Sequence, residues 1–184
     1  MYLKCTTERS AAHQRSLEQQ LLKSMLQTPF EQISISSLCQ EAGVSRKTFY
    51  RLFETKTDVL LALLDHTLLD FETFHPDDSV GPGETHRFLA YWKHHKPLLD
   101  ALKNNHASSV LTDRALLHIL SETPQLIRTF GATTPEYSRE MMLFYVSGIF
   151  ALVMDWHQSG YARSIDEMSE LLNSLMRKSP VKPW

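Results

Sequence analysis

The sequence has little glycine, little cysteine and no long apolar run, and each shortage excludes a class of protein. Only 6 of the 184 residues are glycine, fewer than the tight turns of a β-rich fold usually need. The 2 cysteines are too few for a disulfide framework, so we expect a reduced, cytoplasmic setting. The longest uncharged apolar run, residues 141–154, is too short to cross a bilayer. The N-terminus has no apolar core of the kind that a signal peptide carries.

The common catalytic and metal-binding motifs are also missing. The sequence has no G-x-S-x-G elbow, no P-loop, no G-x-G-x-x-G and no H-E-x-x-H. Its 9 histidines do not show the spacing of metal ligands. We therefore expect a protein that is not an enzyme and holds neither a metal nor a cofactor.

Charge is nearly balanced over the whole chain but unevenly distributed along it. Lys and Arg number 19, and Asp and Glu number 21. Residues 1–60 carry 8 basic and 6 acidic side chains, which leaves 11 basic and 15 acidic side chains in residues 61–184. A polyanionic partner is therefore expected at the N-terminal third.

Apolar residues recur with the period of an α-helix, and proline, glycine or serine separates the periodic stretches. Leu17, Leu21 and Met25, for example, share one face of a helix predicted over residues 8–27. Further helices are predicted over residues 35–42, 46–53, 57–74, 85–95, 97–105, 107–130, 136–159 and 165–178. Residues 75–84 are predicted to form a loop, and Pro124 to kink or split its helix. The fold class predicted is all-α.

The two short helices over residues 35–42 and 46–53 form a helix-turn-helix, in which the second helix enters the major groove of DNA. Arg46 and Lys47 lie in the first turn of that second helix. A cation gains nothing from the helix dipole there, so a polyanionic partner explains both residues better than helix stability does. Arg46 can also donate two hydrogen bonds to guanine.

Residues 42–60 resemble the DNA-binding domain of the tetracycline-repressor (TetR/AcrR) family. They read AGVSRKTFYRLFETKTDVL, and the family pattern is A-G-V-S-x-x-T-[LF]-Y-x-x-F-x-x-K-x-x-L-L. Within these residues Val59 is the one departure, and outside them Pro29 and Ser36 stand where the family often has Gly and a basic residue. The resemblance covers about residues 9–64 and extends to the last two predicted helices. It implies a helix-turn-helix domain over residues 1–57 and an effector-binding and dimerisation domain over residues 58–184.

The resemblance also implies roles for individual residues. Tyr50 and Lys56 match phosphate-contacting positions, and Arg46, Lys47 and Thr48 match base-reading positions. The serines that open the first helix of the motif offer hydroxyls and free backbone N–H groups to a phosphate. The full set of expected DNA-binding residues is Ser34, Ser36, Ser37, Ser45, Arg46, Lys47, Thr48, Tyr50, Arg51 and Lys56.

An effector cavity is implied between residues 85 and 159, where aromatic side chains are frequent, and few charges lie in residues 143–154. We expect an apolar or aromatic effector. The candidate lining residues are Tyr91, Trp92, His95, Phe130, Phe144 and Tyr145. The alternative is that these aromatic side chains only fill the core.

A homodimer is expected through the last two helices. Residues 141–154 are apolar all round, so this helix should be buried on every side, in part by a second chain. Gly148 would allow close helix approach, since glycine is otherwise costly within a helix. The expected interface residues are Gly148, Ile149, Leu152, Trp156, Met168, Leu172 and Leu175.

Together these features predict a homodimeric transcriptional regulator, a ligand-responsive repressor that binds a palindromic operator in duplex DNA and has no membrane partner. Two alternatives stay open. One is a protein–protein adaptor that keeps the fold without reading DNA. The other is an architectural DNA-binding protein that needs no ligand, which a filled C-terminal core would favour.

Overall fold

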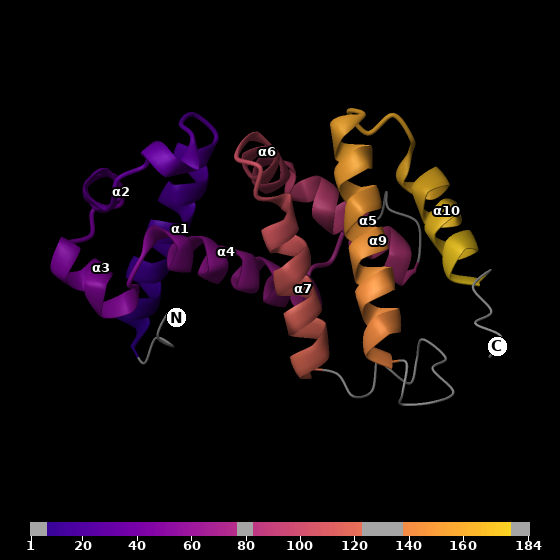
Figure 1. Ribbon diagram of the computed structural model, residues 1–184, viewed down its shortest axis with the longest axis horizontal. Helices are drawn as coiled ribbons and strands as arrows, with labels where there is room; N and C mark the ends of the chain where they lie inside the picture. The colour runs from indigo at the N-terminus through magenta and orange to yellow at the C-terminus, as the bar shows by residue number, and fades with distance from the viewer. Residues whose placement is uncertain (1–6, 77–82, 123–137, 178–184) are drawn as a thin grey trace. The chain divides into compact units, whose positions relative to one another are not determined.

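The computed structural model describes residues 7–76, 83–122 and 138–177, and every regular element in these ranges is helical (Figure 1). This confirms the predicted all-α class. The main helices are α1 (Glu8–Met25), α2 (Ile35–Glu41), α3 (Arg46–Leu52), α4 (Lys56–Asp70), α5 (Glu84–His94), α6 (Lys96–Asn104), α7 (Ser108–Glu122), α9 (Ser138–Gln158) and α10 (Ile165–Arg177). Two 3-10 turns accompany them, η1 (Phe30–Gln32) and η2 (Phe71–Thr73). The predicted break near Pro124 lies outside the described residues.

Contacts divide the chain into two compact units. The first unit comprises Met1–Leu69 and Pro97–Glu122, and the second comprises Asp70–Lys96 and Thr123–Trp184. Helices α6 and α7 thus group with the N-terminal helices, although more than twenty residues of the second unit precede them in the chain. The functional boundary at residue 57 stays a prediction, and the packing units follow a different division.

Side chains of α1 and α4 form much of the core of the first unit. Leu17, Leu21 and Met25 are buried on α1, as their spacing predicted. Helix α4 is buried over most of its surface. Its first turn is held by a capping box: the Thr55 hydroxyl accepts from the Asp58 N–H, and the Asp58 carboxylate accepts from the Thr55 N–H at 2.9 Å.

Two side-chain contacts join helices within the first unit. The carboxylate of Glu18, which is almost fully buried on α1, contacts Nδ1 of His66 on α4 at 2.9 Å. The guanidinium of Arg114 on α7 donates to both carboxylate oxygens of Asp65 on α4. A buried charge is costly unless it is paired, so these contacts fix how α1 and α7 meet α4.

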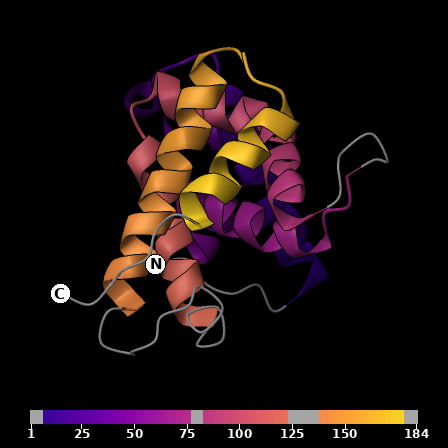
Figure 2. The same cartoon turned by 90° about the vertical axis from the view of Figure 1, so that its right-hand side faces the viewer.

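In the second unit, α5 packs against α9 and α10 (Figures 1 and 2). Leu89 of α5, Trp156 of α9, and Met168 and Leu172 of α10 form one buried cluster. Nε1 of Trp156 donates to the carbonyl of Arg163 at 2.8 Å, which ties the end of α9 to the turn before α10. Among the helices described, none combines the length and apolar character that crossing a membrane requires.

Candidate nucleic-acid interface

Helix α3 has one buried face and one exposed face. Phe49 is 0 % exposed, and Leu52 is buried beside it. Tyr50 is 52 % exposed, although its ring also meets that of Phe49 edge-on at 5.3 Å. The basic residues expected to bind DNA, Arg46, Lys47 and Arg51, are all exposed. The apolar side chains therefore anchor the helix, while the cationic and phenolic groups remain available to a partner.

The turn between α2 and α3 is fixed by backbone geometry. Gly43 has a φ of 66°, a left-handed conformation that costs glycine nothing but strains other residues. The N–H of Val44 then donates to the carbonyl of Cys39 at 2.9 Å. The Val44 side chain is buried next to the turn. These contacts set the angle between the two short helices.

The serines that precede α2 and α3 act as N-caps in this structure. Ser34 Oγ accepts from the N–H of Ser37 at 3.0 Å, and Ser45 Oγ accepts from the N–H of Thr48 at 3.1 Å. The hydroxyls of Ser37 and Thr48 also hydrogen-bond to these caps. Ser36 is exposed. The expected phosphate contacts of the serines stay a prediction, and capping adds a structural role to it.

Lys56 contacts the backbone of the turn between α1 and α2. Its ammonium donates to the carbonyls of Phe30, Glu31 and Ile33 at 2.6, 2.9 and 2.9 Å. It also lies 4.7 Å from the centre of the Phe30 ring. An ammonium has three donors, and all three are used within the chain. Lys56 therefore holds the η1 turn, and its expected phosphate contact stays a prediction.

Cys39 is a small buried group within α2. Burial raises the pKa of its thiol, and the nearby charge of Arg46 opposes the rise only in part. The thiolate, which is the reactive form, is therefore disfavoured.

The aromatic residues expected to line an effector cavity lie in different parts of the structure. Tyr91 and Trp92 are buried in the core of the second unit, where Trp92 meets the Phe150 ring at 5.1 Å. The His95 ring lies tilted against the Tyr91 ring with ring centres 4.4 Å apart. Burial, with the charge of His94, lowers the pKa of His95 to about 4. These three side chains match the core-filling alternative. Phe130 lies outside the described residues.

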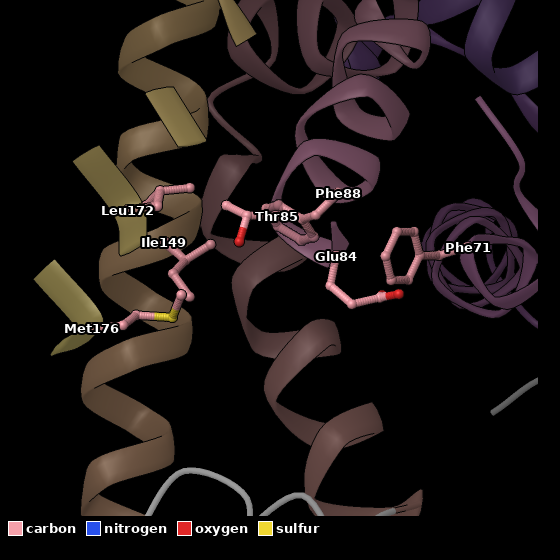
Figure 3. Close-up of a pocket in the computed structure, with 7 residues that line it drawn as sticks. All are labelled: Phe71, Glu84, Thr85, Phe88, Ile149, Leu172 and Met176. Carbon is pink, nitrogen blue, oxygen red and sulfur yellow. The ribbon is translucent and has the colours of Figure 1, made fainter. Parts of the chain in front are cut away.

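A pocket of about 190 Å³ opens elsewhere in the second unit (Figure 3). Figure 3 shows side chains from η2 and α5 on one side and from α9 and α10 on the other. The pocket is lined by Phe71, Glu84, Thr85, Phe88, Ile149, Leu172 and Met176. Arg87 donates to the Glu84 carboxylate at 2.7 Å, so the one acidic group of the lining is neutralised. No sequence motif marked these residues, because four separate elements contribute them.

A second hollow, of about 330 Å³, lies along α9 and α10. Its lining includes Phe144 and Tyr145 of the expected effector cavity and five residues of the expected dimer interface. The lining residues are Phe144, Tyr145, Gly148, Ile149, Leu152, Leu172, Leu175 and Met176. Phe144 is 72 % exposed and Leu175 is half exposed. An apolar surface on two adjacent helices therefore faces away from the core.

Three residues expected at the dimer interface, Trp156, Met168 and Leu172, lie in the core of their own chain, and their role in a dimer stays a prediction. All three are buried against Leu89 within their own chain, so little of their surface remains for a second chain. The spacing of apolar residues could not separate the inner face of α10 from its outer face. The exposed part of the expected set consists of Gly148 and Leu175, with Ile149 and Leu152 partly buried.

A serine, a histidine and an aspartate also lie together between α5 and α10. Nδ1 of His86 is 3.0 Å from Ser169 Oγ, and Nε2 is 3.1 Å from Asp166 Oδ1. Ser169 is 0 % exposed, so no substrate carbonyl can reach its hydroxyl. The three groups form a structural link. Among the residues that the structure describes, no group of three or more His, Cys, Asp or Glu side chains is placed to hold a metal.

Both halves of the chain match models of transcriptional regulators. Residues 22–63 match the model of "Bacterial regulatory proteins, tetR family", and residues 85–178 match that of a "Transcriptional regulator C-terminal region". The crystal structure of Lin0861 from Listeria innocua has a similar fold, with a TM-score of 0.71 over 96 % of each chain and 21 % sequence identity. No curated protein matches the chain.

Proposed function

This chain belongs to the tetR family of transcriptional regulators, and we propose that it binds a specific duplex DNA sequence through α3. The exposed face of α3 carries the proposal, because Arg46, Lys47, Tyr50 and Arg51 project from a helix whose other face is buried. A helix of this size fits the major groove. Its cations can contact base edges and phosphates together. Since genomic DNA is the proposed partner, we place the protein in the cytoplasm.

Arg46 and Lys47 are the proposed base-reading residues, with Thr48 beside them. Tyr50 and Arg51, and the hydroxyl groups at the start of α2, are the proposed phosphate contacts. Phosphate contacts fix the position of a protein on DNA, whereas contacts to base edges select the sequence. Loss of a phosphate contact should therefore weaken binding to every duplex, and loss of Arg46 should weaken binding to the preferred one.

We also propose that the protein acts as a homodimer and represses transcription from a palindromic operator. The apolar hollow along α9 and α10 supports this proposal, since a second copy would cover Phe144 and Leu175. A two-fold symmetric dimer places the same helix on two half-sites. Their centres should lie about 34–36 Å apart, or a multiple of that distance.

Selection of bound duplexes from a random library tests this function. We expect the purified full-length chain to enrich one palindromic sequence. Its affinity for the enriched duplex should fall steeply with salt, because ionic contacts to phosphate release counterions. Enrichment of no sequence despite tight binding to every duplex would identify the architectural alternative. An absence of DNA binding at low salt would leave the adaptor.

The 190 Å³ pocket is our proposed effector site, in place of the aromatic cluster around Tyr91. A cavity of about 150 Å³ with an apolar lining can hold benzene, so this pocket suits an uncharged molecule with one or two small rings. Phe71 of η2 lines it, and η2 follows α4 directly in the chain. A bound molecule would therefore contact a turn that continues directly from α4, and α4 is the helix that follows α3.

Thermal unfolding with small aromatic probes tests the effector site. We expect indole to raise the melting temperature of the full-length chain, because a ligand stabilises the state that it binds. In Thr85→Trp the indole side chain should fill the pocket and abolish the rise in melting temperature. Ser121→Trp, on the exposed surface of α7, should keep that rise. An unchanged rise in Thr85→Trp would mean that indole binds elsewhere.

A further inference from the structure

The turn between α1 and α2 is held from two sides by residues far away in the sequence. The N–H of Phe30 donates to Oδ1 of Asn105 at 2.5 Å, and the carbonyl of Phe30 accepts from Nζ of Lys56 at 2.6 Å. Lys56 opens α4, whereas Asn105 directly follows α6. Both polar groups of one backbone position are therefore bound by side chains that are 26 and 75 residues away.

Asn105 uses every hydrogen-bonding group of its side chain except one oxygen lone pair. Its Nδ2 donates to the carbonyl of Met25 at 3.0 Å and to the carbonyl of Ala101 at 2.7 Å. Met25 is the last residue of α1, so no N–H of that helix donates to its carbonyl. One amide thus caps α6, caps α1 and fixes the N–H that opens η1.

The backbone after Asn105 is built to hold that side chain in place. His106 has a φ of 53°, which is uncommon for a residue other than glycine. The N–H of Ala107 donates to the carbonyl of Leu102 at 2.8 Å and closes the turn. This arrangement ends α6 abruptly, so that Asn105 sits at the helix end with its amide against the α1–α2 turn.

We propose that Asn105 is a positioning residue for DNA binding, an inference that rests on the proposed function. The η1 turn runs directly into Ser34, the N-cap of α2, and α3 follows through the Gly43 turn. A shift of η1 therefore moves both helices of the motif. Asn105 has no contact with DNA in this proposal. It acts by keeping η1 in the position from which α3 binds.

The expected effect of losing Asn105 follows from the population of the binding-competent state. Without the amide, the Phe30 N–H and the Met25 carbonyl lose their partners, and the position of η1 loses that support. The apparent dissociation constant rises as the competent fraction falls. If that fraction drops to about one tenth, affinity for the preferred duplex falls about tenfold.

Three single substitutions in the full-length chain test the proposal. Asn105→Ser can keep a bond to the Ala101 carbonyl, since a serine hydroxyl reaches the carbonyl four residues back, but it is too short to reach Phe30 and Met25. Asn105→Ala loses all three bonds. Asn104→Ala is the matched control, because Asn104 directly precedes Asn105 at the end of α6 and its side chain is exposed. Each variant is measured for affinity to the selected duplex and for hydrogen exchange at the Phe30 amide.

We expect Asn105→Ser and Asn105→Ala to bind about equally weakly, roughly tenfold below the wild type, with an unchanged salt slope. Phe30 exchange should accelerate in both, and Asn104→Ala should match the wild type. Wild-type affinity in Asn105→Ser would overturn the proposal, because capping of α6 would then be the whole role. Unchanged Phe30 exchange would overturn it as well, even if the wild type bound no DNA and the proposed function itself had failed.

Discussion

The cations of α3 and the cation that opens α4 have different surroundings in the first unit. Arg46 and Lys47 are exposed on the outer face of α3, where a phosphate or a base edge can reach them. The ammonium of Lys56 is bound to three backbone carbonyls of the α1–α2 turn. A surface cation contributes little to stability, whereas a cation that donates to several backbone carbonyls contributes more.

Lys56→Ala should therefore destabilise the fold rather than remove an ionic contact to DNA. Loss of three charged hydrogen bonds should lower the free energy of unfolding by on the order of 2 kcal/mol, and the slope of affinity against salt should stay unchanged. Arg51→Ala is the matched comparison, because Arg51 is exposed and is a proposed phosphate contact: its stability should hold, while its slope falls by roughly 1. Urea unfolding and binding at several salt concentrations measure both. A lower slope in Lys56→Ala with full stability would contradict this expectation and support the phosphate role.

In the α3 region, the spacing of residues predicts which side chains are buried and which are exposed. It does not predict the partner of every side chain. The burial of Phe49 and the exposure of Arg46 follow from helical periodicity alone. The contact between Lys56 and the Phe30 carbonyl joins positions that periodicity does not relate. Asn105 had no distinguishing signal, because asparagine after a helix is an ordinary capping residue.

At the scale of elements, α9 has two apolar faces with different surroundings. Met142, Val146 and Phe150 are buried within the second unit. Phe144 and Leu143 are exposed on the other side, and Phe144 shares its hollow with Leu175 of α10. Gly148 leaves open space where a side chain would stand. A second copy of this pair of helices is the proposed cover.

Phe144→Glu and Leu175→Glu should each convert the dimer to a monomer. A carboxylate in an apolar interface loses its hydration without gaining a partner, and two-fold symmetry places it there twice. Leu117→Glu provides the control, since Leu117 is similarly exposed on α7. Sedimentation equilibrium at micromolar concentration measures the outcome. A wild-type monomer, or dimers of unchanged affinity in both variants, would refute the interface.

Helix ends were predictable where a local residue determines them and not where a distant contact does. Ser34, Ser45 and Gly43 mark the ends of α2 and α3 through their own caps and conformation. The predicted helix over residues 57–74 instead changes to a 3-10 turn after Asp70. Arg87 donates to the Phe71 carbonyl at 2.9 Å and stacks on its ring, and no nearby residue could reveal that contact.

At the scale of the whole chain, the two compact units do not follow sequence order. Arg114 pairs with Asp65 across 49 positions, and Asn105 meets Phe30 across 75, which brings α6 and α7 into the first unit. A pattern of helices predicts the fold class but not such pairings, since each apolar stripe can pack against several others. For the same reason, the pattern of helices does not predict the pocket between η2, α5, α9 and α10.

The central claim is that α3 selects a DNA sequence through Arg46, and the ratio of two affinities tests it most directly. The enriched duplex and a scrambled duplex of equal composition are titrated with the wild type and with Arg46→Ala at one salt concentration. We expect the substitution to cost on the order of 1–3 kcal/mol on the enriched duplex and much less on the scrambled one, so that the ratio collapses. An equal loss on both duplexes would contradict the claim and leave Arg46 as a phosphate contact.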